Sequence, residues 1–135
     1  MKVFLSVGMH GRTMEEIHHD ITKMKKELHR LYPDKDLSFV DNADCVGVDD
    51  DGRLYYLGEA IKKMDGCEIV FFYPDYSTHR GCLVEEMVAK LYNIKRIYLQ
   101  ELLQWLRKRQ KVLKTLRCHG QKMTSKRFKI NRIFT

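Results

Sequence analysis

The segment 67-CEIVFFY-73 decides the predicted fold. It is an apolar run of strand length, and Pro74 ends it. A strand with apolar side chains at successive positions is buried on both faces, which is typical of a parallel sheet covered by helices on both sides. The sequence therefore predicts an α/β protein with this segment near the middle of its sheet.

Strand and helix patterns alternate on both sides of this segment. The expected strands cover Lys2–Val7, Leu37–Val40, Cys67–Tyr73 and Lys95–Leu99. The expected helices run from a capping box at Thr13 and Glu16 to Leu31, from Leu54 to Met64, and from Gly81 to Leu91. This order predicts a flavodoxin-like or Rossmann-like three-layer domain with a mainly parallel sheet of about four or five strands.

The distribution of charge divides the chain in two. The net charge is +7, but residues 1–100 carry 14 Lys/Arg against 17 Asp/Glu, whereas residues 101–135 carry 11 against 1. A length of 135 residues suits one compact domain. We therefore expect an α/β domain over residues 1–100 and a basic helical extension over residues 101–135.

The sequence shows no clear signal for secretion, for a membrane span or for a metal site. The first residues, MKVFLSV, lack the features of a signal peptide, and no window approaches the length of an apolar membrane span. The cysteines Cys45, Cys67, Cys82 and Cys118 show no CxxC spacing, so we expect reduced thiols and no metal site. The acidic segment Asp41–Arg53 is interpreted as a solvated loop. Together these features favour a cytoplasmic protein that does not associate with a membrane.

Two loops carry the groups expected to bind a ligand. Ligands of open parallel sheets bind at the carboxyl ends of the strands, here Gly8–Thr13 and Pro74–Gly81. Both loops combine glycines with hydroxyl, imidazole and guanidinium groups and lead into helix N-termini, which favours a phosphate-bearing or sugar-bearing small molecule. Neither matches the Walker or dinucleotide pattern. The candidate binding residues are Ser6, Gly8, Met9, His10, Gly11, Arg12, Asp75, Ser77, Arg80 and Gly81.

Three runs together resemble a known family. KVFLSVGMHGRT at residues 2–13, LYYLGEA at 54–60 and RGCLVE at 80–85 are similar to the nucleoside 2-deoxyribosyltransferase-like superfamily, in particular its small phage and bacterial branch. The resemblance implies no metal or organic cofactor, a nucleoside or nucleotide ligand, and a homodimer or larger homo-oligomer in which a neighbouring chain completes the pocket. It also implies that Glu85 attacks the anomeric carbon of the ligand.

The sequence departs from this family at two positions, and alternatives stay open. Phe4 stands where active enzymes have a tyrosine, and Ala60 where they have a carboxylate, so His79 or His10 would have to supply the acid. Glu85 is also explained by the helix dipole alone, as a solvated charge in a first helical turn. The chain is therefore either an N-glycosidase or deoxyribosyltransferase with Glu85 and His79 as catalytic residues, or an inactive binder of a nucleotide-like ligand.

The basic extension offers a third class of function. Glu101–Arg117 has leucines at helical spacing with lysines and arginines over the remaining surface, so it either covers the sheet or binds a partner. Gln121–Thr135 adds cations interleaved with phenylalanines. The alternative function is thus a phage-type interaction protein, such as an anti-defence protein, that acts on nucleic acid, an acidic protein or a host complex. Its candidate contact residues are Arg107, Lys108, Arg109, Lys111, Lys126, Arg127 and Lys129.

Overall fold

The computed structural model describes residues 1–43 and 52–118. In these residues the fold is α/β, built on a four-stranded sheet in the order β2-β1-β3-β4. Every strand pairing in it is parallel. The strands are β1 (Lys2–Ser6), β2 (Ser38–Asp41), β3 (Ile69–Phe72) and β4 (Lys95–Tyr98). The predicted flavodoxin-like or Rossmann-like three-layer fold is confirmed.

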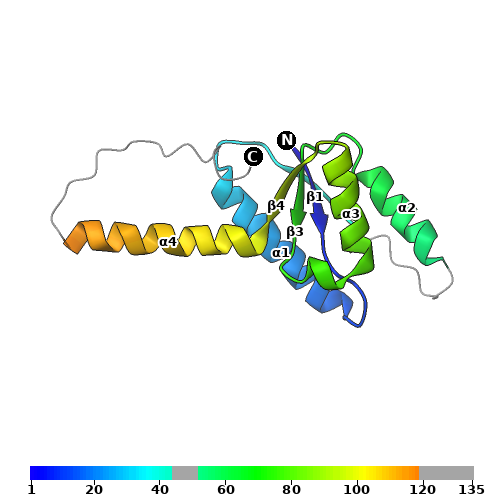
Figure 1. Cartoon of the computed structure of the whole chain (residues 1–135), viewed down its shortest axis with the longest axis horizontal. Coiled ribbons are helices and arrows are strands. Elements are labelled where there is room, and N and C mark those ends of the chain that lie inside the picture. The colour runs from blue at the N-terminus through cyan, green and yellow to red at the C-terminus, as the bar shows by residue number, and fades with distance from the viewer. Residues whose placement is uncertain (44–51, 119–135) are drawn as a thin grey trace.

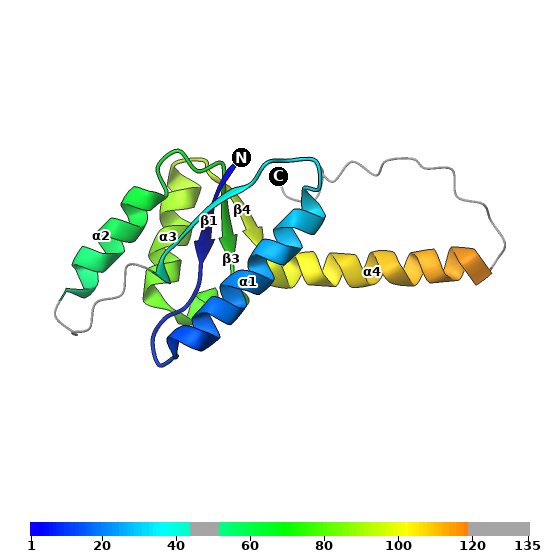
Figure 2. The ribbon, with the colours of Figure 1, turned by 180° about the vertical axis from the view of Figure 1, so that it is seen from behind.

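Helices cover both faces of the sheet. They are α1 (Met14–Leu31), α2 (Arg53–Lys63), the short 3-10 helix η2 (Tyr76–Thr78), α3 (Arg80–Leu91) and α4 (Leu99–Cys118). Figure 1 and the reverse view in Figure 2 show α1 on one face of the sheet and α2 and α3 on the other. They also show α4 extending away from the sheet and the other helices.

The alternation of side chains along each strand divides the core into two layers. Val3 and Leu5 of β1 point to the α1 side, whereas Phe4 points to the side of α2 and α3. The larger cluster joins the first face to α1 and the start of α4, and includes Ile17, Ile21, Met24, Leu28, Phe71, Ile97, Leu99 and Leu102. The smaller cluster consists of Phe4, Ala60, Met64, Cys67, Val70, Phe72 and Ala89. Both faces of β3 are thus buried, as its apolar sequence predicts.

Helix α1 begins with the expected capping box. The Thr13 hydroxyl accepts a hydrogen bond from the Glu16 backbone N–H at 3.2 Å, and the Glu16 carboxylate accepts one from the Thr13 N–H at 2.8 Å. The apolar stripe from Ile17 to Leu31 is buried. Met14 is an exception, because the side chain of this first helical residue is 44% exposed.

Several predicted boundaries were wrong by one or two residues. β3 is shorter than 67–73 because the Cys67 N–H bonds to the Met64 carbonyl at 3.0 Å and closes the turn after α2. Leu99 belongs to α4, not to β4, and helical spacing buries it together with Leu102. In the second loop, η2 precedes α3, which begins at Arg80. The predicted division at residue 100 therefore falls within α4, and the separation into two parts stays a prediction.

Residues 1–43 and 52–118 contain no helix with the length and apolar character that crossing a bilayer needs. Most of the acidic segment predicted to be a loop, residues 44–51, and the end of the basic extension, residues 119–135, lie outside the described residues.

Candidate functional site

The strand order places the two predicted ligand loops next to each other. From β1 the sheet extends to β2 on one side and to β3 and β4 on the other, so the order reverses between β1 and β3, where open α/β sheets bind ligands. A Cβ added to Gly8, in the first loop, would lie 2.0 Å from the Cδ2 and Nε2 atoms of His79 in the second. The imidazole therefore packs directly on the backbone of Gly8, and a larger residue at position 8 would have to displace it.

Glu85 is buried at this point and is not a solvated helix charge. Its side chain is 1% exposed. The Ser6 hydroxyl, at the end of β1, donates a hydrogen bond of 2.5 Å to Glu85 Oε2. The Asn42 amide, just after β2, donates a longer one of 3.4 Å to Glu85 Oε1. Two segments that are distant from α3 in sequence thus hold its carboxyl group.

Asn42 is a site residue that sequence reasoning missed. Its Nδ2 donates to the Val7 carbonyl at 3.0 Å, and its Oδ1 accepts from the Val7 N–H at 3.3 Å, so the side chain clamps the backbone that follows β1. Asn42 was included in the acidic segment interpreted as a solvated loop, but it is 8% exposed. The available signal was its position directly after a strand, at the same edge of the sheet as the two ligand loops.

Burial dominates the electrostatics of this cluster. It raises the pKa of Glu85 to about 7, and the hydrogen bonds from Ser6 and Asn42 act in the opposite direction because they favour the ionised form. Near neutral pH, both forms of Glu85 are therefore present. Burial, with the nearby Glu85 as a further cause, raises the pKa of the Cys82 thiol to about 12, so that this buried thiol stays protonated.

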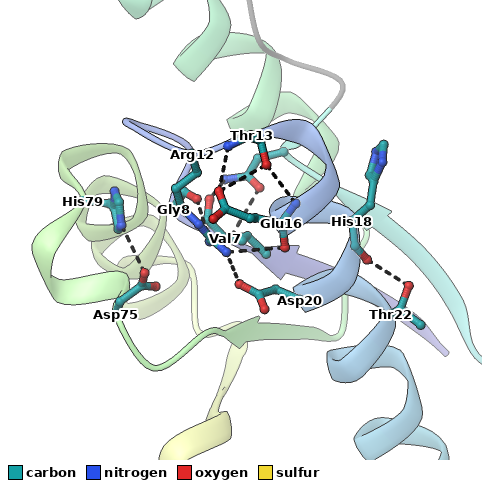
Figure 3. Close-up of polar contacts among 11 residues, drawn as sticks. Val7, Gly8, Arg12, Thr13, Glu16, His18, Asp20, Thr22, Asp75 and His79 are labelled. Carbon is teal, nitrogen blue, oxygen red and sulfur yellow. Dashed lines mark hydrogen bonds and ion pairs between the residues drawn. The ribbon is translucent and has the colours of Figure 1, made fainter.

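His79, the predicted acid, lies at the start of α3 beside Asp75. Its Nε2 is 3.3 Å from Asp75 Oδ2, and Figure 3 shows the two side chains pointing toward each other. The second oxygen of Asp75 is buried without a hydrogen-bond partner among the described residues. The arrangement fixes the orientation of the imidazole between Asp75 and Gly8.

Arg12 is committed to contacts within the protein. It forms an ion pair with Asp20 of α1 and donates to the Gly8 carbonyl at 3.0 Å (Figure 3). Its guanidinium carbon lies 5.8 Å from the centre of the Tyr73 ring. Burial, followed by the nearby Asp20, raises the pKa of Tyr73 to about 12. Arg12 therefore fastens the first loop to α1. To contact a ligand, as predicted, its guanidinium would have to give up its bonds to Asp20 and Gly8.

The other predicted loop residues lie closer to solvent. Met9 is partly buried and packs against the α1 side of the core, and Gly81 is also partly buried. The remaining candidates, His10, Gly11, Ser77 and Arg80, are exposed. Gly11 has a φ of 74°, in the left-handed region that favours glycine.

Phe4 and Ala60, the two positions at which the sequence departs from the family that it resembles, lie in the apolar core. Phe4 is fully buried and Ala60 is 3% exposed, and both belong to the cluster beneath α2 and α3. Glu59 points elsewhere, toward Lys62, to which it forms an ion pair of 2.6 Å. No second carboxylate from α2 therefore approaches Glu85.

The predicted contact residues of the extension divide into two groups. Arg107, Lys108, Arg109 and Lys111 are exposed on α4. Lys126, Arg127 and Lys129 lie outside the described residues. Within residues 1–43 and 52–118, no three His, Cys, Asp or Glu side chains are grouped so that they could hold a metal ion.

Comparison of the chain with protein-family models, with curated proteins and with solved structures returns no match.

Proposed function

We propose that the protein cleaves or exchanges the N-glycosidic bond of a nucleoside or nucleotide, with Glu85 as the nucleophile. The observation that carries the proposal is the contact between Ser6 and Glu85 at the reversal of strand order. The resemblance of residues 2–13, 54–60 and 80–85 to the nucleoside 2-deoxyribosyltransferase-like superfamily supports the same reaction, and it leads us to expect a homodimer or larger homo-oligomer.

The reaction would proceed in two displacements. The ionised Glu85 attacks the anomeric carbon, the bond between carbon and nitrogen breaks, and the base departs with a proton from a general acid. Water or a second base then displaces Glu85 from the glycosyl-enzyme intermediate, and the acid regains its proton. The hydrogen bonds from Ser6 and Asn42 favour the ionised form that the first step needs.

His79 is the candidate for the general acid. Imidazole is the most common proton-transfer group in enzymes. The ring of His79 is held between Gly8 and Asp75, at the start of the helix that carries Glu85. It therefore stands in for the acid groups that Phe4 and Ala60 do not provide.

A second candidate function is the binding of a nucleotide-like ligand without turnover. It is favoured by the burial of Glu85, which is 1% exposed and already bonded to Ser6 and Asn42. In this alternative the carboxyl group joins α3 to β1 and β2, and the ligand contacts the exposed side chains of the two loops.

Incubation with a panel of substrates tests the choice. The panel contains 2′-deoxynucleosides, their monophosphates and NAD-like dinucleotides, and chromatography detects released base. We expect base release that falls at least about 1000-fold in Glu85→Gln. Glu86→Gln is the matched control, because it removes the neighbouring carboxylate, which accepts a hydrogen bond from Tyr98 at 2.6 Å and takes no part in the proposed site.

The outcomes separate the two functions. Base release that survives in Glu85→Gln would contradict Glu85 as the nucleophile. An absence of base release combined with a ligand-dependent rise in Tm favours the binder. If no compound is cleaved and none raises Tm, both proposals are wrong.

A further inference from the structure

Helix α4 leaves the rest of the domain after its first turns. Leu99 and Leu102 are buried in the α1-side cluster, and Leu103, Trp105 and Leu106 pack against it. From Arg107 to Thr115 every side chain except the partly buried Leu113 is exposed. Figures 1 and 2 show this half of α4 extending beyond the body of the protein. The start of the helix is thus anchored in the core, and residues 107–115 are left exposed.

The projecting half of α4 is strongly and uniformly basic. It carries Arg107, Lys108, Arg109, Lys111 and Lys114, and the nearest acidic residue in sequence is Glu101, in the anchored first turn. Steps of four and three residues place Arg107, Lys111 and Lys114 on one face of the helix. Their Cα atoms are about 6 Å and about 4.5 Å apart along the axis. These three cations therefore form a row along one face of α4.

This row is unfavourable without an anionic partner. Like charges three or four residues apart destabilise a helix, and no acidic side chain alternates with them here. Residues 119–135 add Lys122, Lys126, Arg127, Lys129 and Arg132 without any Asp or Glu. A polyanion would relieve the repulsion along α4.

We propose that the projecting half of α4, residues 107–115, binds the phosphate backbone of nucleic acid. A second copy of the chain is disfavoured, because it would bring the same cations together. A lipid surface is disfavoured as well, because an interfacial helix needs a broad apolar face. In the part of α4 whose side chains are described, the exposed large apolar side chain beyond Arg107 is Val112, at 58% exposure.

The mode of binding follows from the side chains. Lysine and arginine bind phosphates without reading base edges, so the affinity should depend strongly on salt and weakly on sequence. The site is separate from Glu85, and this inference does not rest on the proposed N-glycosidic activity.

A salt titration of binding tests the proposal. The anisotropy of a short labelled DNA duplex, of the corresponding single strand and of an RNA duplex is measured with the full chain between about 50 and about 200 mM KCl. The test variant is Arg107→Gln/Lys111→Gln/Lys114→Gln, which preserves helix propensity. We expect at least about tenfold weaker binding and a salt slope smaller by about 3.

A charge-matched variant supplies the control. Lys26→Gln/Lys35→Gln/Lys90→Gln removes the same number of charges from exposed positions on α1, the loop after it and α3. It should bind nucleic acid like the wild type. Equal losses in the two variants, or no loss in the α4 variant, would overturn the proposal. So would equally tight binding to polyglutamate or to anionic vesicles, because the partner would then be an acidic protein or a lipid surface.

Discussion

The Ser6 hydroxyl donates a hydrogen bond of 2.5 Å to the carboxyl group of Glu85, and the two residues are 79 positions apart in the chain. Ser6 ends β1, and Glu85 lies in the first turns of α3. Both side chains are buried. The bond links the two elements that flank the candidate site, and it partly offsets the rise in the pKa of Glu85 that burial causes.

Removal of the Ser6 hydroxyl should make Glu85 harder to ionise. In Ser6→Ala the carboxyl loses a donor that favours its charged form, so its pKa should rise above about 7. The unpaired buried oxygen should lower the free energy of unfolding by about 1–3 kcal/mol. Carboxyl carbon NMR measures the pKa, with the Glu85 signal assigned from Glu85→Gln, and urea denaturation measures the stability. Ser77→Ala, which removes an exposed hydroxyl, is the control, and an unchanged Glu85 titration in Ser6→Ala would refute the role of this bond.

The buried Glu85 should make stability fall as pH rises. Its pKa increases from 4.5 to about 7 on folding, so between these values the folded protein holds a proton that the unfolded chain has lost. Relative to Glu85→Gln, the free energy of unfolding of the wild type should decrease by about 3 kcal/mol from pH 4 to pH 8 and stay constant above. Urea denaturation across this range measures the difference. Parallel stability curves for the two proteins would show that the carboxyl group ionises normally.

Asn42 should control both stability and the titration of Glu85. Asn42→Ala removes the bonds to the Val7 backbone and to Glu85, and we expect a loss of about 1–3 kcal/mol. Asn42→Asp keeps the shape but places a carboxylate beside Glu85, which should raise the pKa of Glu85 more than the alanine variant does. Denaturation and carboxyl NMR distinguish the effects. If the two variants shift the pKa of Glu85 equally, the amide acts only through packing.

The contact between Gly8 and His79 should make the first loop intolerant of a side chain. Gly8→Ala places a methyl group against the imidazole and should cost about 1–3 kcal/mol. His79→Ala in the same chain should recover most of this loss, which a double-mutant cycle measures. Gly58→Ala is the matched control, since a Cβ there meets nothing within 4 Å and alanine is favoured inside α2. Additive losses in the cycle would contradict the contact.

The sequence predicted the fold well where apolar periodicity was strong. The apolar run of β3 and the apolar stripe from Ile17 to Leu31 on α1 are examples. The structure has a strand and a helix at these places, as the two patterns predict. The boundary at Leu99 was wrong because a buried leucine fits the end of a strand and the start of a helix equally well, and its contacts with α1 decide between them.

The candidate site could be predicted only in part. Ligands of open parallel sheets bind at the carboxyl ends of the strands, and this rule predicted that the loop of Gly8 and the loop of His79 lie at the same edge of the sheet. The contact between the two residues confirms it. The expected position of Glu85 in a first helical turn was wrong, because α3 begins at Arg80 and has no acidic residue in its first turn. The burial of Glu85 could not be predicted from the sequence of α3 alone. Its environment depends on Ser6 and Asn42, which reach it only when the strands have assembled in the order observed.

Because β1 lies inside the sheet, both strands that pair with it are synthesised after it. Strand β1 is hydrogen-bonded on one side to Ser38–Asp41 and on the other to Ile69–Phe72, and both of these strands follow it in the chain. Until the last of these has emerged, one edge of β1 offers unpaired backbone groups flanked by Val3, Phe4 and Leu5. Until residue 72 has been synthesised, β1 is therefore exposed to misassociation with other chains.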